Sequence, residues 1–123
     1  DDHLSYMQCS YGDIQNGLTL SQFKKSWQEF AGDSYTLATW NEITHRLFLE
    51  ILDVRCPAIQ LKRVYCSLSG GKCGALHTVL NNHDLTPVDF GIGMRAGLRL
   101  GNAAAITGFL RDVGLKRLSE LSP

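Results

Sequence analysis

The spacing of apolar residues predicts helices along most of the chain. In the first third, apolar side chains recur every three or four residues, the period of one helical face, at Leu20, Phe23, Trp27 and Phe30. Thr19, followed three residues later by Gln22, fits a capping box at the start of this helix. Gly32 is placed to end it, because glycine adopts the left-handed conformation that closes many helices.

A second apolar stripe predicts a helix that begins near Thr36 or Thr39 and runs to about Asp53. Its apolar positions are Leu37, Trp40, Ile43, Leu47, Phe48 and Ile51. Thr39 and Glu42 form a second candidate capping box, and Glu42 pairs with Arg46 one turn later. Aromatic residues at helical spacing are typical of a core, so both tryptophans are expected to be structural.

The middle of the chain has a mixed pattern. Residues 56–68 fit a helix, but the part between 58 and 66 would also fit a short strand pair. The turn Ser69-Gly70-Gly71 follows, and a short helix is expected from Cys73 to about Leu80.

Helix boundaries in the last third follow from proline and glycine. Thr86 as N-cap and Pro87 at the first helical position predict a helix over 87–100. Gly101 and Gly114 then act as weak breaks. They divide the remainder into helices near 103–113 and 115–121.

These elements predict an all-α fold class: a compact single-domain bundle of about six short helices over residues 1–123, with room for one short strand pair near 58–66. The length of 123 residues agrees, since it is close to the commonest size for one domain. Composition is ordinary for a globular protein, at 44% hydrophobic and 20% charged residues, and no apolar stretch is long enough to span a membrane. Two stacked helical halves, split near residue 69, are the alternative arrangement.

Three glycines in the last third fall four residues apart, at Gly93, Gly97 and Gly101, and the series continues into Ala105. On a helix they form a stripe of small residues that another backbone can approach closely. The stripe either packs inside the domain or lines a groove that admits a partner helix or an apolar ligand. The three glycines are therefore candidate partner-binding residues. Each costs a helix about 1 kcal/mol of propensity, so we expect a contact that offsets this cost.

Charge is balanced overall but uneven along the chain. Residues 1–53 carry eight acids and three bases, residues 54–83 carry four bases and no acid, and the remainder carries five bases and four acids. The basic middle either attracts the acidic first half within one fold or meets an acidic protein or a phosphate backbone. For the second interpretation the candidate partner-binding residues are Arg55, Lys62, Arg63, Tyr65 and Lys72.

The same basic stretch holds three of the four cysteines and two of the four histidines. Cys56, Cys66, Cys73 and His77 are separated by nine, six and three residues, spacings that tetrahedral zinc accepts. This pattern resembles the family of CCCH zinc fingers. The resemblance implies a zinc ion held by these four side chains and binding to RNA.

Two other interpretations of the cysteines stay open. Their even number, with Cys9 near the N-terminus, is compatible with one or two disulfides in any of three pairings. Reduced, partly buried thiols would instead fit an intracellular protein. The sequence opens on Asp1-Asp2-His3 without an initiator Met, as a processed chain or an excised piece would. Any targeting signal is then out of view, so the cellular compartment has to be predicted from the cysteines. An intracellular location is favoured over secretion, and the oligomeric state is left open.

Catalytic constellations are weak. Cys73 and His77 fall one helical turn apart but lack an orienting third group, and Ser69 to Lys72 is too short for a phosphate loop. The expected function is therefore a non-enzymatic protein-recognition module with no cofactor and another protein as partner. A nucleic-acid-binding domain centred on residues 54–83, with or without zinc, is the first alternative. A secreted, disulfide-stapled helical ligand carrier is the second.

Overall fold

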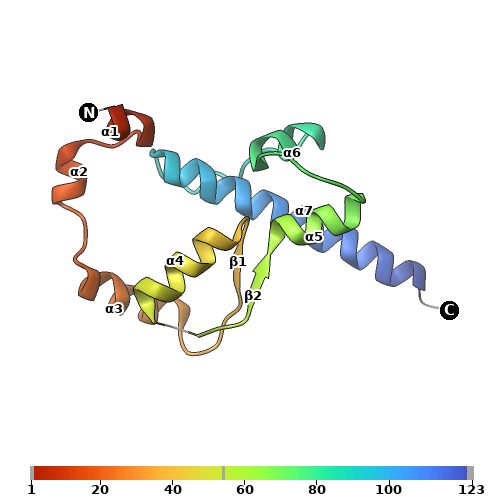
Figure 1. The fold of residues 1–123 in the computed structure, drawn as a ribbon, viewed down its shortest axis with the longest axis horizontal. Helices are drawn as coiled ribbons and strands as arrows, with labels where there is room; N and C mark the ends of the chain where they lie inside the picture. Colours follow the sequence, from red (N-terminus) through yellow and green to blue (C-terminus); the bar gives the residue numbers. More distant parts are fainter. Residues whose placement is uncertain (1, 54, 122–123) are drawn as a thin grey trace. The chain divides into compact units, whose positions relative to one another are not determined.

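A computed structural model describes residues 2–53 and 55–121, and helix dominates in both stretches (Figure 1). Seven helices and one pair of short parallel strands make up the secondary structure of these residues, which confirms the all-α class at a coarse level. The chain forms two compact units, residues 1–59 and 60–123, called here the N-terminal unit and the C-terminal unit. The single domain over residues 1–123 stays a prediction.

The N-terminal unit contains a β–α–β crossover. The two strands, β1 and β2, lie parallel, and the Leu37 amide donates a hydrogen bond of 2.9 Å to the Pro57 carbonyl where the pair begins. Parallel neighbours need a long connection, and here α4 supplies it. The elements that belong to this unit, up to the last residue of β2, are α1 (Asp2–Met7), α2 (Tyr11–Gln15), α3 (Leu20–Ala31), β1 (Leu37–Thr39), α4 (Glu42–Leu52) and β2 (Ala58–Gln60).

Helix α3 begins and ends where its local signals place it. The Thr19 amide donates to Gln22 Oε1 at 2.9 Å, and the Gln22 amide donates to Thr19 Oγ1 at 3.2 Å, so the predicted capping box is confirmed. Gly32 ends the helix at a φ of 70°, as expected. All of these signals lie within one turn of the boundary that they set.

Helix α4 starts later than its apolar stripe indicates. Residues 37–39 form β1, and Asn41 is the N-cap, since its Oδ1 accepts from the Thr44 amide at 3.2 Å. The predicted capping box of Thr39 and Glu42 is therefore wrong, because Thr39 is buried in the strand and its hydroxyl donates to the Asn41 carbonyl. The Glu42–Arg46 pair is confirmed at 3.5 Å.

Trp27 is the centre of an aromatic cluster in the N-terminal unit. Its ring centroid lies 4.6 Å from that of Phe48 and 5.7 Å from that of Tyr35, both edge to face. Its indole Nε1 also donates to the Tyr35 hydroxyl at 3.1 Å. This half-buried tryptophan thus joins α3, α4 and the segment between them, which is the structural role that its helical spacing predicts.

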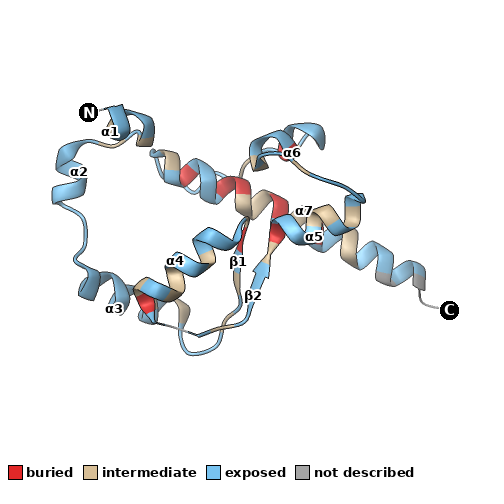
Figure 2. Ribbon diagram, in the orientation of Figure 1, coloured by how far each residue is buried: buried red, intermediate tan, exposed pale blue. Residues whose placement is uncertain are grey.

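The C-terminal unit packs two short helices against a long one. The helices are α5 (Leu61–Ser69), α6 (Leu76–Asn82) and α7 (Arg95–Leu121), and α7 contacts both of the others. Figure 2 shows the buried positions of this unit on α7, in α6 and at the start of α5. The buried apolar side chains are Leu61, Val79, Leu80, Ile106 and Leu110.

Three boundaries in the C-terminal unit differ from the predicted ones. No helix forms over residues 87–94, and α7 begins only at Arg95. It then continues for 27 residues through both Gly101 and Gly114, so the predicted breaks are wrong. Helix α6 begins at Leu76 instead of Cys73. Of the residues 58–66 that would fit a strand pair, 58–60 form β2, whose partner is β1, and the rest lie in α5.

Among the described residues, none of the helices combines the length and the apolar character that a membrane span requires.

Candidate functional site

Gly97 and Gly101 lie beneath a segment of the same chain. A Cβ at Gly97 would overlap the carbonyl oxygen and side chain of Ile92, and a Cβ at Gly101 would overlap the carbonyl of Val88. The Val88 amide also donates to the Gly101 carbonyl at 3.1 Å. The two glycines therefore let residues 88–92 run directly over the first turns of α7. Gly93, the third predicted partner-binding glycine, precedes the helix, and a Cβ there would meet open space.

The covering segment and the first turns of α7 expose several large apolar side chains. Six of them within 13 residues are between 40% and 52% exposed. We call these six the apolar segment: Val88, Phe90, Ile92, Met94, Leu98 and Leu100. At about 100° per residue, Leu98 and Leu100 project about 80° to either side of the line through Gly97 and Gly101. They therefore flank the place where residues 88–92 are seated.

A tight turn fixes the middle of the apolar segment. The Gly91 amide donates to Asp89 Oδ1 at 2.8 Å, an Asx turn, and Gly91 has a φ of 73° that favours glycine. Thus both the turn and the hydrogen bond between Val88 and Gly101 set the position of Phe90. The sequence does not reveal this site, because Pro87 and the apolar spacing resemble the start of a helix.

The predicted basic residues are divided between the two units. Lys62 and Arg63 are exposed in the first turn of α5, and Lys72 is exposed beyond its end, whereas Arg55 belongs to the N-terminal unit. By sequence the N-terminal unit has four bases and eight acids, a net charge of −4, and the C-terminal unit has eight bases and four acids, a net charge of +4. The zero net charge of the chain is therefore a cancellation between its halves.

Tyr65 is part of a small polar and aromatic cluster. Its hydroxyl lies 2.8 Å from Nε2 of His83, and the His83 ring lies against Phe109 with a centroid distance of 4.6 Å. The rings of Tyr65 and His83 meet edge to face. The cluster joins α5, the end of α6 and α7. Sequence reasoning missed it, because its members are far apart along the chain.

The cysteines are arranged as one bonded pair and two free thiols. Cys66 and Cys73 form a disulfide with a Cα–Cα distance of 6.1 Å, while Cys9 and Cys56 are free and half-buried. A bonded pair offers zinc no thiolate. In residues 2–53 and 55–121, no three His, Cys, Asp or Glu side chains come together as metal ligands would. Because Cys73 precedes α6, it does not share that helix with His77.

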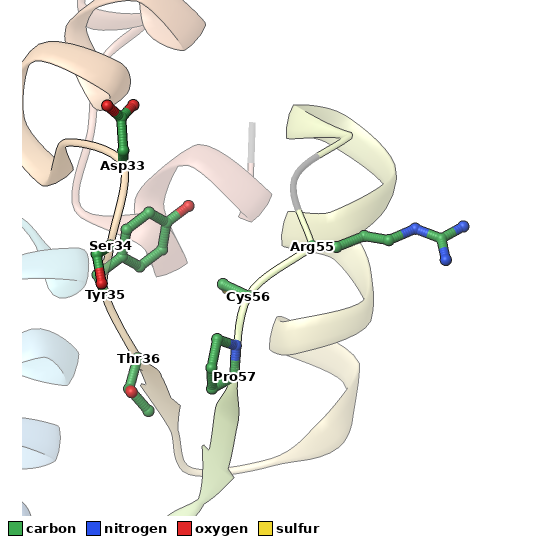
Figure 3. A pocket seen from close by; sticks show the side chains of 7 residues that line it. All are labelled: Asp33, Ser34, Tyr35, Thr36, Arg55, Cys56 and Pro57. Atoms are coloured by element: carbon green, nitrogen blue, oxygen red, sulfur yellow. The ribbon is translucent and has the colours of Figure 1, made fainter.

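A shallow hollow of about 240 Å³ opens in the N-terminal unit, where β1 and β2 begin. It is lined by Asp33, Ser34, Tyr35, Thr36, Arg55, Cys56 and Pro57 (Figure 3). The Asp33 carboxylate accepts a hydrogen bond of 2.8 Å from Gln28 Nε2, and the Arg55 side chain extends away from Cys56. Because neither charged group is directed at the thiol, the geometry assigns no reaction to this hollow.

Comparisons with protein-family models, with curated proteins and with solved structures found no match to this chain.

Proposed function

We propose that this chain is a non-enzymatic protein-recognition module that binds its partner through the apolar segment. The observation that carries the proposal is the exposure of six large apolar side chains within residues 88–100. Exposed apolar groups that lie close together are typical of interaction sites, and Phe, Met and Leu supply large contact areas there. What this surface offers a partner is contact area, and it has no titratable side chain among its six defining residues.

The backbone beneath the surface supports this proposal. Residues 88–92 are seated on Gly97 and Gly101, and the Asx turn at Asp89 fixes the loop between them. A surface that is already ordered loses less conformational entropy when it binds, which favours affinity. This interpretation keeps Gly97 and Gly101 in the recognition site, as supports of the contacting residues.

A photo-crosslinking experiment tests the proposal. Phe90 is replaced by p-benzoylphenylalanine, which keeps the phenyl ring in place, and the full chain is irradiated in an extract of its native cells. The matched control carries the same probe at Phe30, which is 84% exposed in the N-terminal unit. We expect a discrete protein adduct from position 90 that is weak or missing from position 30. The adduct should disappear when Leu98→Asp is added.

Two results would contradict the proposal. Equal adducts from both positions would show that exposure alone captures proteins. An adduct at position 90 that persists with Leu98→Asp would show that the apolar segment does not recognise the partner as a surface.

Nucleic-acid binding is the second candidate, and the charge of the C-terminal unit favours it. Its net charge is +4, and Lys62, Arg63 and Lys72 are exposed. If phosphates are the target, affinity for a fluorescent single-stranded RNA should fall steeply between 50 and 200 mM salt, following about 0.7 counterions per phosphate contact. The double variant Lys62→Ala/Arg63→Ala should reduce that slope. An affinity for RNA that does not change with salt concentration would exclude nucleic-acid binding through phosphates.

A further inference from the structure

The disulfide between Cys66 and Cys73 closes the connection between α5 and α6. Cys66 lies in the last turn of α5, and Cys73 lies three residues before α6 begins. Gly70 and Gly71 stand between them, with nothing within 4 Å of a Cβ built at either position. Residues 69–72 are exposed. The bond therefore spans a loop that is open to solvent.

The two ends of this connection are anchored independently of the disulfide. At the end of α5, Arg117 Nη2 donates to the Leu68 carbonyl at 3.4 Å. In α6, the side chains of Val79 and Leu80 are only 2% exposed and pack in the core of the unit. Opening the disulfide therefore leaves both helices attached to α7.

The start of α6 has weaker support. Its N-cap is Ala75, which makes no side-chain capping bond, and the helix has only seven residues. Helices of this length are unstable without tertiary contacts, and the buried pair Val79 and Leu80 holds only the second half. In the first turn only Leu76 is half-buried, and the Cys66–Cys73 bond ties the chain to α5 three residues before that turn.

The disulfide is also open to chemical attack. Both cysteines are half-buried and the loop between them is exposed, so we expect a small reductant to reach the bond. Lys72 adjoins Cys73, and residues 55–83 contain no acid. Because a thiolate is the attacking species in exchange, a lysine next to the bond favours its approach.

We propose that the Cys66–Cys73 disulfide is a redox-sensitive clasp that holds the 69–78 loop and first helical turn in place and releases them on reduction. The reductant is a dithiol. One of its thiolates attacks a sulfur of the pair, which breaks the S–S bond and forms a mixed disulfide, and its second thiol then displaces the remaining cysteine. Two electrons and two protons pass to Cys66 and Cys73, which end as thiols, and the dithiol ends as a disulfide.

Hydrogen exchange of the full chain, followed by mass spectrometry, tests the clasp. With dithiothreitol as the dithiol, amide exchange at Thr78 and Val79, which donate to the Ala75 carbonyl at 3.1 and 3.2 Å, should rise by about tenfold or more, because the loop constraint on the first turn is lost. Exchange over residues 102–113 of α7 should change less than twofold. Oxidised glutathione should restore the protection.

Matched variants separate the clasp from other effects of the reductant. Cys66→Ser/Cys73→Ser should show the fast exchange without dithiothreitol and no further response to it. Cys9→Ser/Cys56→Ser should respond as the unaltered chain does, since those thiols are free.

Three results would overturn the proposal. Alkylation of all four cysteines in the unfolded, unreduced chain would show that the bond is not formed. Equal exchange before and after reduction would show that the bond holds nothing in place. Rapid exchange throughout α7 on reduction would show a staple for the whole unit instead of a local clasp.

Discussion

Gly101 is a point at which α7 has no room for a side chain, so Gly101→Ala tests how the apolar segment is seated. A Cβ there would overlap the Val88 carbonyl oxygen and would stand 3.3 Å from the Val88 nitrogen. Because the backbone of a helix moves little, residues 88–92 would have to lift. The hydrogen bond from the Val88 amide to the Gly101 carbonyl would be lost with that movement.

The size of the effect follows from three terms. Alanine favours a helix over glycine by about 1 kcal/mol. Against this stand the lost hydrogen bond, about 1 kcal/mol, and the overpacking, about 1–3 kcal/mol. We therefore expect Gly101→Ala to lower the free energy of unfolding by about 1–3 kcal/mol. Gly108 is the matched control, since a Cβ there meets nothing within 4 Å, and Gly108→Ala should raise the same free energy by about 1 kcal/mol.

Urea unfolding followed by circular dichroism at 222 nm measures both variants. Both tryptophans, Trp27 and Trp40, belong to the N-terminal unit, so their fluorescence serves as an internal control that neither substitution should change. Hydrogen exchange at the Val88 amide should speed up in Gly101→Ala alone. If Gly101→Ala stabilises the chain as much as Gly108→Ala does, then residues 88–92 are not seated on α7.

Three further predictions concern a cap, the core and pH. Asn41→Ala should lower the stability of the N-terminal unit by about 1 kcal/mol through the loss of the α4 N-cap, measured by tryptophan fluorescence in urea, and no loss would contradict the cap. Leu80→Ala should lower the free energy of unfolding by about 2–5 kcal/mol, measured by thermal unfolding, because Leu80 is buried. Leu98→Ala, at an exposed position, should lower it far less, and equal losses would contradict the burial of Leu80. The backbone amide and then the hydroxyl of Ser10 lower the pKa of Asp13 below its usual 3.8. The stability that these two hydrogen bonds give α2 is therefore present above pH 3.8 and is lost as the pH falls through the lowered pKa. In the unaltered chain, the chemical shifts of residues 11–15 should become less helical over that pH range. In Asp13→Asn they should not change with pH in this range.

In the N-terminal unit, the sequence predicts the elements that depend on nearby residues better than those that depend on residues far along the chain. The Thr19–Gln22 box and the glycine that ends α3 are both as expected, since each acts within about one turn. Strand β1 depends instead on pairing with β2, about 20 residues away, and its own three residues do not indicate that pairing. Its Leu37 consequently looks like the first position of the stripe that continues into α4.

The C-terminal unit shows the same limit in its glycines. Propensity alone favours a break at Gly101, at a cost of about 1 kcal/mol, and the sequence interpretation follows it. The contact that offsets this cost, between Gly101 and Val88, exists only because Asp89 and Gly91 turn the chain back over the helix. A stripe of glycines predicts that something approaches closely, and the structure identifies it as the preceding loop.

The sequence does not predict that the apolar side chains of the candidate site are exposed to solvent. Phe90 and Leu98 have the composition of core residues, and only the position of α7 shows that they face solvent. The sequence could not select the bonded cysteine pair, because four cysteines permit three connectivities. Tyr65 and His83 are 18 residues apart and meet through packing of α5 and α6 on α7.

The apolar segment and the net charge of the C-terminal unit would contribute differently to the proposed recognition. Contacts to Phe90 and Leu98 remove apolar surface from water, and their loss acts mainly on the rate of dissociation. The charge of +4 acts at longer range, so it favours acidic partners and raises the rate of encounter in a manner that salt screens. An acidic protein with an exposed apolar face would satisfy both properties, whereas a nucleic acid would chiefly use the charge. The apolar segment is thus what favours a protein as the partner.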